Sequence, residues 1–276
     1  MLSEAFTYVF AKCQNKFKRL GYLHEAIAID SRRRRCRSAW TDHLQNSQKA
    51  IIKAVEKAEN RNRIVILGAG AGYDVPLEFL LTKFKEIHLV DVVFLRPILK
   101  LAKTHSQITL VEIDTTGVIN QLPGGKKGPI IISQLSPAPP REVLTGADLV
   151  ISCNLMSQLP INIKNKLVTL GAVEDSKEVE LFCRSILTSH LSWLEDCDAP
   201  VLLLADLEQH FVPKNQMNEK PIKENALLGV VFDNVDQSWL WNIAPCPEVD
   251  KDYSLKHLVG SFYLQKNEKF IVKYLL

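Results

Sequence analysis

Residues 64–72 read IVILGAGAG, a short apolar run that passes directly into three alternating glycines. Consecutive aliphatic residues of this kind are typical of a strand that is buried on both faces of a parallel sheet. Glycine after such a strand lets the backbone approach a ligand closely, and the first N–H groups of the next helix can bind polar or anionic atoms. The segment therefore predicts a buried strand, then a ligand-binding loop, then a helix.

The same alternation continues downstream, where short apolar runs are separated by amphipathic stretches. Further strands are predicted at residues 86–91, 108–113, 147–152 and 200–205, and helices at residues 76–85, 95–103 and 174–195. Strands that alternate with helices in this way form a parallel sheet with crossover helices. Residues 115–146 interrupt the pattern with proline and glycine, and allow at most a short extra strand at residues 130–133.

The two ends of the chain have different sequence patterns, helical at the amino terminus and strand-like at the carboxyl terminus. Residues 3–60 contain one glycine and no proline, which predicts two or three helices, the last with Trp40, Leu44, Ile51 and Val55 on one face. Strands predicted near the carboxyl terminus follow an antiparallel pattern and cover residues 238–243, 257–264 and 270–275, the last two joined by a turn at residues 265–268. We expect a helical cap (1–60) and an α/β domain (61–276).

The spacing of the glycines discriminates between cofactors. A dinucleotide fingerprint, G-x-G-x-x-G/A, needs glycine or alanine where this chain has Tyr73. The pattern G-x-G-x-G at residues 68–72 instead resembles the nucleoside-binding loop of class I S-adenosylmethionine-dependent methyltransferases, and the resemblance extends at superfamily level from about residue 40 to the end. It implies an α/β, Rossmann-like fold: a seven-stranded-type, mostly parallel twisted sheet with antiparallel C-terminal strands, flanked by helices, plus an N-terminal helical cap.

This resemblance also implies S-adenosylmethionine as the cofactor and assigns roles to polar residues that follow the predicted strands. Asp91 stands nineteen residues after Gly72, where the family has a carboxylate that accepts from both ribose hydroxyls. Asp114 matches an aspartate that accepts from the adenine amino group, and Asn154 follows the fourth strand beside the donor and acceptor sites. The expected cofactor-binding residues are Gly68, Ala69, Gly70, Gly72, Tyr73, Asp74, Asp91, Val92, Asp114 and Asn154.

One position departs from the family pattern. Many members carry an acidic residue two positions before the first glycine, and this chain has Ile66 there. Contact with the methionine amino group must then come from elsewhere, and Asp74 is the candidate. The departure also favours an alternative in which the chain is a non-catalytic nucleoside-binding module of a complex.

The catalytic residues are less defined, and His43 and Asn154 are the candidates. In this fold class an amino-terminal helix often covers the cofactor, so His43 is either a general base or acceptor contact, or a structural histidine at the helix–domain seam. The run RRRRCR at residues 32–37 is either a phosphate-binding patch or, as we favour, a solvated helix face with arginines paired to carboxylates. No N-P-P-Tyr-like segment follows the fourth strand, so a nucleic acid is possible as acceptor but is not favoured.

Composition limits the remaining classes. The 276 residues are 46% hydrophobic and 24% charged, as in an ordinary globular protein, and the six cysteines form no C-x-x-C pair or zinc-ligand grouping, so no metal is expected. Apolar runs fall short of the roughly 18 residues of a membrane span, and the amino terminus does not resemble a secretory signal, which predicts a cytoplasmic protein without a membrane partner. Residues 1–60 hold 12 Lys and Arg against 6 Asp and Glu, so the basic excess is amino-terminal.

The leading hypothesis is methyl transfer from S-adenosylmethionine to an unidentified acceptor, either a small molecule or a macromolecule. The first alternative is the non-catalytic module named above. The second is an NAD-dependent oxidoreductase, which Tyr73 and the antiparallel terminal strands disfavour.

Overall fold

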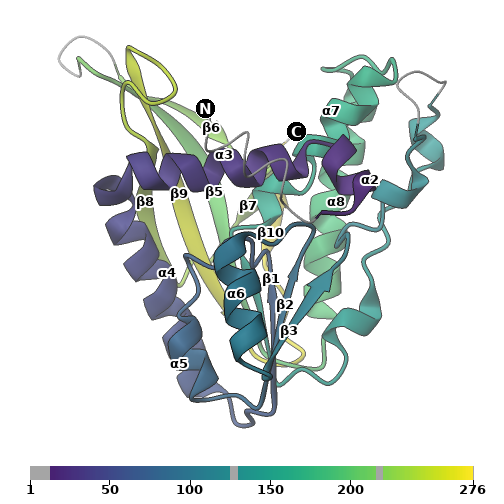
Figure 1. Cartoon of the computed structure of the whole chain (residues 1–276). Coiled ribbons are helices and arrows are strands. Elements are labelled where there is room, and N and C mark those ends of the chain that lie inside the picture. The colour runs from purple at the N-terminus through teal and green to yellow at the C-terminus, as the bar shows by residue number, and fades with distance from the viewer. Residues whose placement is uncertain (1–12, 125–129, 216–219, 276) are drawn as a thin grey trace.

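The computed structural model describes residues 13–124, 130–215 and 220–275, and its centre is one twisted sheet (Figure 1). The strand order is β3-β2-β1-β4-β5-β9-β8, with β6 paired to β5. The strands are β1 (Arg63–Leu67), β2 (Glu86–Asp91), β3 (Ile108–Glu112), β4 (Leu149–Cys153), β5 (Val201–Pro213), β6 (Ile222–Asn225), β8 (Gln237–Ala244) and β9 (Tyr253–Leu264). Strands β1 to β5 are mutually parallel, whereas β9 runs antiparallel to both β5 and β8. The predicted fold class is confirmed.

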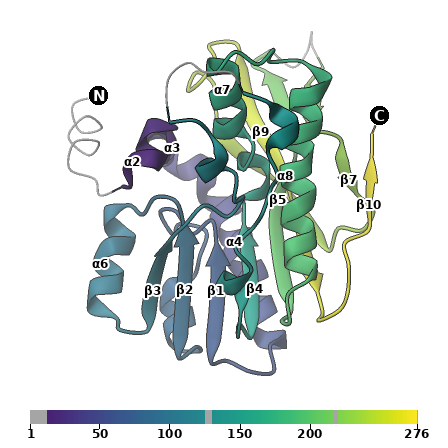
Figure 2. The same ribbon diagram turned by 90° about the vertical axis from the view of Figure 1, so that its right-hand side faces the viewer.

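Helices cover both faces of this sheet. They are α2 (Asn15–Arg19), α3 (Tyr22–Arg35), α4 (Arg37–Lys57), α5 (Leu77–Leu81), α6 (Arg96–Thr104), α7 (Ile161–Thr169) and α8 (Lys177–Glu195). Apolar residues of α7 and α8 pack on one face, and those of α4, α5 and α6 pack on the other, as Figure 2 shows for α8 and α4. The sheet is therefore the middle layer of three, which accounts for its almost continuous apolar strands.

The strand order reverses at β1, which pairs with β2 on one side and β4 on the other. Ligands of open α/β sheets bind at such a point, outside the carboxyl ends of the strands. Helix α3 lies across these ends (Figure 1), and its Leu23 and Ile27 pack against Val93 and Leu95, which follow β2. The fold thus encloses the place where the sequence predicts a site.

Several predicted elements differ from those observed. Helix α5 is shorter than the predicted 76–85, β5 continues well beyond residue 205, and α7 was not predicted. The proposed strand at 130–133 is wrong, because Ile132–Gln134 is a 3-10 helix that buries Ile132 in the core beside α8. A strand at residues 130–133, just before β4 in the chain, could not pair with β4, because both edges of β4 are already paired with β1 and β5.

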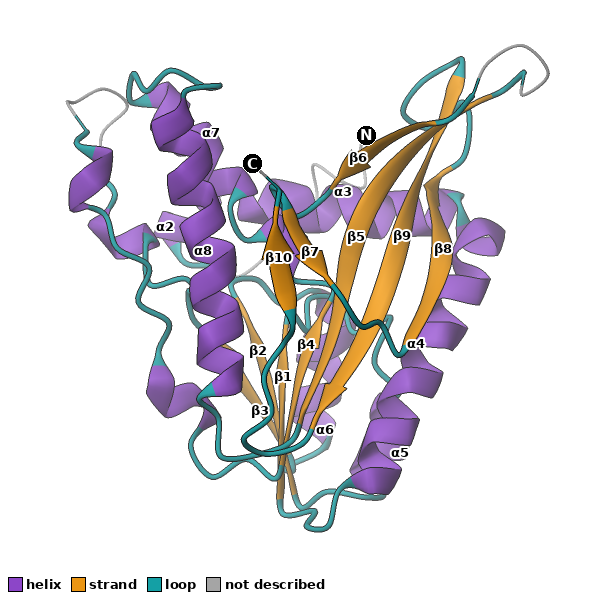
Figure 3. Cartoon of the chain, turned by 180° about the vertical axis from the view of Figure 1, so that it is seen from behind, coloured by secondary structure: helices purple, strands orange, loops and turns teal. Residues whose placement is uncertain are grey.

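The predicted hairpin between residues 257–264 and 270–275 is also wrong. β9 lies inside the main sheet, whereas β10 (Val272–Tyr274) pairs with β7 (Val230–Phe232) in a separate two-stranded ribbon (Figure 3). The rings of Phe232, Phe262 and Phe270 pack together, and this contact fixes the return of the chain.

The amino-terminal segment is helical from residue 15 to 57 apart from short turns, as predicted, while residues 1–12 lie outside the described residues. Ala50, Ile51, Ala54 and Val55 of α4 belong to the same core as β1 and β2. The division of the chain at residue 60 stays a prediction. Within the described ranges, no helix combines the length and the apolar character needed to span a membrane.

Candidate functional site

The glycine loop after β1 adopts backbone angles that demand glycine. Gly68 and Gly72 have φ of +75° and +73°, in the left-handed region that side chains disfavour. A Cβ at Gly68 would lie 2.8 Å from the Cys153 carbonyl oxygen, and one at Gly72 would lie 2.4 Å from Ile98 Cδ1. The loop is therefore packed tightly against β4 and α6, and Gly70 between them carries the N–H group that meets the next strand.

Asp91, at the end of β2, is tied to this loop. The Gly70 N–H donates to Asp91 Oδ2 at 2.7 Å, and the N–H groups of Val92 and Val93 donate to Oδ1 at 2.7 and 3.3 Å. A carboxylate offers about four acceptor positions, so about one is left for a further donor. Burial raises the pKa of Asp91 to about 6, against the opposing effect of these N–H groups. The geometry fits a carboxylate that accepts from a ribose hydroxyl.

Asp114 has a different set of contacts. Its Oδ1 accepts from the Thr116 N–H at 2.9 Å and the Thr116 hydroxyl at 2.6 Å, and its Oδ2 accepts from the Ile119 N–H at 2.8 Å. These bonds fold the loop after β3. An adenine amino group would therefore have to donate to a carboxylate that already accepts three hydrogen bonds from this loop.

Tyr22 of α3 is a neighbour of both carboxylates that the sequence did not single out. Burial raises the pKa of Tyr22, and the charges of Asp114, Glu25 and Asp91 raise it further. The side chain is therefore close to Asp91 at the end of β2 and to Asp114 after β3. A tyrosine on a helix with weak apolar periodicity gives no local signal of such a position.

The remaining loop residues fix the amino-terminal helices. Ala69 is buried, and Val92 packs beside Ala71 and the apolar residues of α3. The Tyr73 hydroxyl donates to Asp30 of α3, and the Tyr73 carbonyl accepts from the Gln48 amide at 3.0 Å. Tyr73 thus ties the loop to both α3 and α4.

The arginine run lies beside this contact. Arg33 stacks over the Tyr73 ring at 4.1 Å, Arg34 pairs with Asp30 at 2.5 Å, and Arg35 pairs with Glu248 at 2.6 Å. The interpretation of the run as a helix face whose arginines pair with carboxylates is confirmed for Arg34 and Arg35.

His43, Asp74 and Asn154, all predicted site residues, come together at the end of β4. His43 Nδ1 accepts from Trp239 Nε1–H at 3.0 Å, and His43 Nε2 lies 2.8 Å from Asp74 Oδ1 and 3.4 Å from the Asn154 amide nitrogen. This pattern assigns the proton of the neutral ring to Nε2. His43 is fully buried and stacks on Trp241, with ring centroids 3.9 Å apart. The lone pair of His43 Nδ1 is thus taken by Trp239, and Nε2 lies within ion-pair distance of Asp74.

A second histidine–carboxylate pair stands next to the first. Asp206, in β5, has Oδ2 2.9 Å from the Ser157 hydroxyl, which donates to it, and 3.1 Å from His257 Nδ1 of β9. Burial and the charges of Asp74 and Asp206 raise the pKa of the Cys153 thiol, which lies near both carboxylates. One usable signal for this pair is present in the sequence, because Asp206 directly follows the predicted fifth strand, just as Asp91 stands at the end of the second. His257 comes from a distant strand and could not be placed.

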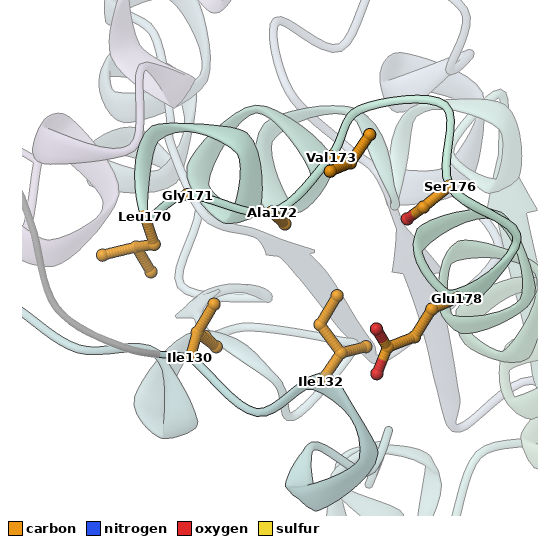
Figure 4. Close-up of a pocket in the computed structure, with 8 residues that line it drawn as sticks. All are labelled: Ile130, Ile132, Leu170, Gly171, Ala172, Val173, Ser176 and Glu178. Atoms are coloured by element: carbon orange, nitrogen blue, oxygen red, sulfur yellow. The ribbon is translucent and has the colours of Figure 1, made fainter.

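A pocket of about 370 Å³ lies elsewhere, at the junction of α7 and α8 (Figure 4). Its lining is mostly apolar and includes Ile130, Ile132 and Val173, with Ser176 and Glu178 at one side. Ser176 caps α8 by accepting from the Val179 N–H at 3.3 Å. None of the predicted site residues lines this pocket, so we place the site at the strand ends instead. In the described part of the chain, no three metal-ligating side chains gather in one group.

No protein-family model matches this chain, and no curated protein sequence matches it. Solved structures resemble it at low identity. DhpI in complex with SAH is 9% identical, covers 88% of this chain and 96% of that chain, and has a TM-score of 0.35. A SAM-dependent methyltransferase from Leishmania major is 9% identical, with coverages of 94% and 82% and a TM-score of 0.33.

A third structure is the 1,6-didemethyltoxoflavin-N1-methyltransferase of Burkholderia thailandensis with bound S-adenosylhomocysteine. It is 11% identical, covers 86% of this chain and 89% of that chain, and has a TM-score of 0.30. Because these TM-scores are low, we base the fold and the site on the strand order and the contacts of this chain.

Proposed function

We propose that the chain binds S-adenosylmethionine at the carboxyl ends of β1, β2 and β4 and transfers its methyl group to an acceptor held between α4 and the sheet. The observation that carries this proposal is Asp91 beside Gly70, 2.7 Å from its N–H, at the point where the strand order reverses. There a carboxylate with acceptor capacity meets a glycine loop, as a nucleoside requires. The antiparallel β9 and β8 complete the sheet that the resemblance implies.

The cofactor supplies a methyl group on an activated sulfonium, so the residues of this chain have mainly a positioning task. Asp91 accepts from the ribose, and α3 with Tyr22 covers the nucleoside and excludes water. Asp74, which follows the glycine loop in the chain and lies 2.8 Å from His43 Nε2, is the carboxylate for the cofactor's amino group, in place of the residue that Ile66 does not provide. Ile66 itself is fully buried in the core beneath the loop, which agrees with a structural part for that position.

The alternative NAD-dependent oxidoreductase has less support. Tyr73 occupies the position where a dinucleotide loop packs closely on its strand, and here its side chain turns to Asp30 of α3. The non-catalytic module keeps one supporting feature, the absent acidic residue at position 66. It needs the same nucleoside site, so binding alone does not separate it from the enzyme.

Thermal unfolding of the purified protein, alone and with S-adenosylhomocysteine or NAD, tests the proposal. A ligand at one hundred times its dissociation constant stabilises a protein by about 2.7 kcal/mol, which corresponds to roughly 5–10 °C at this size. We expect a shift with S-adenosylhomocysteine and none with NAD. A shift with NAD alone would overturn the proposal, and a shift with neither at millimolar concentrations would contradict a nucleoside site. Methyl transfer from labelled cofactor then separates the enzyme from the module.

A further inference from the structure

Two histidine–aspartate pairs meet across Trp241 in the layer between α4 and the sheet. The ring of His43 stacks on Trp241 at 3.9 Å, and that of His257 meets the same indole edge-on at 5.7 Å. Asp74 pairs with His43 and Asp206 pairs with His257. The cluster lies beside the glycine loop, because Asp74 follows that loop directly in the chain.

Several polar atoms of this cluster are buried and have no hydrogen-bond partner among the described residues. They are Asp74 Oδ1, Asp206 Oδ1, Asn154 Oδ1, Trp241 Nε1 and both ring nitrogens of His257. Asp206 is 2% exposed, Asn154 5% and His257 8%. A buried polar group without a partner costs about 1–3 kcal/mol, so a concentration of such atoms indicates a ligand that completes them. The side chain of Asp74 is 25% exposed, so the cluster reaches solvent at one end.

The unpartnered set has a chemical bias. Asp74 Oδ1, Asp206 Oδ1 and Asn154 Oδ1 are acceptors, and one ring nitrogen of a neutral His257 is an acceptor as well. In the described ranges the ion-pair neighbours of Asp74 and Asp206 are histidines, with no lysine or arginine. Because the proposed function assigns Asp74 to the amino group of the cofactor, Asp206 is the carboxylate that still lacks a cation in this layer of indole rings, and cationic nitrogen also binds favourably to aromatic walls.

We infer that this cluster is the methyl-acceptor site and that it takes a protonatable amine, with Asp206 as the carboxylate that receives the nitrogen. The inference rests on the proposed function, which supplies the methyl donor. An ammonium group would donate to Asp206 Oδ1 and to the Asn154 amide oxygen, two of the oxygens to which the described residues give no partner.

The proton of the amine then has a defined destination. An ammonium nitrogen has no free electron pair, so it must lose a proton before it reacts. His257, whose two ring nitrogens have no hydrogen-bond partner among the described residues, accepts this proton at the nitrogen that is unprotonated in the neutral ring. The freed lone pair forms the new N–C bond with the methyl carbon. The C–S bond breaks and its electron pair stays on sulfur, which leaves a neutral thioether.

His257 suits this task better than His43. The lone pair on His43 Nδ1 is occupied by Trp239 Nε1–H, so the proton of the neutral ring is on Nε2, which lies 2.8 Å from Asp74 Oδ1. His43 has no free acceptor position for a further proton. The sequence-based candidate His43 is thus a positioning residue in this proposal, and His257 is the catalytic residue.

Binding of simple amines to the protein without cofactor tests the site independently of methyl transfer. Isothermal titration compares methylamine, phenethylamine and spermidine with the uncharged phenethyl alcohol and the anionic phenylacetate. We expect the amines to bind in preference to the other two compounds. Asp206→Asn should weaken amine binding by about 10- to 100-fold, the range for a hydrogen bond to a charged group.

Glu208→Gln is the matched control, because Glu208 lies in the same strand and also pairs with a histidine, at 2.6 Å from His210 Nε2. It is opposite Leu258, so its side chain points to the other face of the sheet from His257. Amine affinity should be unchanged in this variant.

The melting temperatures of the same variants give a readout that needs no ligand. A buried carboxylate whose cationic partner is the ligand destabilises the protein when no ligand is bound. Asp206→Asn should therefore melt at the same temperature as the wild type or at a higher one. Equal binding of amines, alcohol and carboxylate, together with a lower melting temperature of Asp206→Asn, would show a water-filled structural cluster and overturn the inference. If the wild-type protein bound amines but did not bind S-adenosylhomocysteine, this result would instead contradict the proposed function alone.

Discussion

The N–H of Gly70 and the carboxylate of Asp91 are 2.7 Å apart, and this bond joins the loop after β1 to the end of β2. Because each strand is held by its neighbours in the sheet, the carboxylate is fixed before any ligand arrives. Preorganisation of this kind spares a ligand the cost of ordering the site.

Replacement of Asp91 by alanine should weaken binding of S-adenosylhomocysteine by about 1.5–3 kcal/mol, the scale of hydrogen bonds to a charged group. Titration calorimetry of both proteins measures the difference. Asp148→Ala is the control, since Asp148 also accepts from backbone N–H groups, those of Asn62 and Arg63 at 2.5 and 2.9 Å, but at the opposite end of the strands. Wild-type affinity in Asp91→Ala would remove Asp91 from the site.

The affinity for S-adenosylhomocysteine should depend on pH through Asp91. Ribose hydroxyls donate to the ionised carboxylate, and burial raises its pKa to about 6, so the affinity should be constant above neutral pH and fall below pH 6, approaching tenfold per pH unit. Calorimetric titration at a series of pH values measures this, and Asp91→Asn should show a flat profile over the same range. An unchanged wild-type affinity at pH 5 would contradict the assignment.

The same shift has a consequence for stability with a defined sign. The folded-state pKa of about 6 lies above the ordinary value of 3.8, so the folded protein binds more protons between these values. The contribution of Asp91 to the free energy of unfolding is therefore fully present below about pH 4 and is lost as the pH rises through 6. A bound ribose would reduce this loss.

Local features of the sequence were enough to predict the central strands. The runs that form β1, β2 and β3 are apolar, end at glycine or a carboxylate and lie near their partners in the chain, so their positions follow from sequence alone. Asp91 and Asn154 were found for the same reason, because each directly follows such a run. In the structure Asn154 has φ of +47°, a turn conformation that asparagine tolerates.

The parts that sequence did not predict depend on contacts between distant segments. β10 pairs with β7, about forty residues earlier, because the Phe270 ring packs on Phe232 and Phe262. Likewise, Asp206 meets His257 through the register of β5 with β9, which shifts between Asp206 and Glu208. A register of this kind is set by packing, and one residue of slip would turn His257 to the other face.

Removal of the Tyr73 hydroxyl tests the link between the glycine loop and α3. In Tyr73→Phe the buried Asp30 Oδ1 loses its donor, so we expect the free energy of unfolding to fall by about 1–3 kcal/mol. Urea unfolding measures this change. Tyr263→Phe is the control, because the Tyr263 hydroxyl is buried without a hydrogen-bond partner among the described residues, and its removal should leave stability unchanged or higher. Equal losses in both variants would mean that the bond to Asp30 contributes nothing.

Gly68→Ala tests whether close packing of the loop, beyond its backbone angle, requires glycine. The new Cβ would meet the Cys153 carbonyl oxygen at 2.8 Å and Leu155 Cβ at 2.9 Å, so strain adds to the cost of the positive φ. Gly171→Ala separates the two effects, since Gly171 also has a positive φ, +104°, and nothing lies within 4 Å of its Cβ position.

A left-handed residue costs about 1–2 kcal/mol, and overpacking adds about 1–3 kcal/mol. Gly68→Ala should therefore unfold at a lower urea concentration than Gly171→Ala. It should also lose binding of S-adenosylhomocysteine, because the Gly68 N–H donates to the Val90 carbonyl at 2.9 Å and any shift there moves the loop away from Asp91. Gly171→Ala should keep wild-type binding. If the two variants lost equal stability and both bound the ligand, the loop would be more adaptable than its contacts imply.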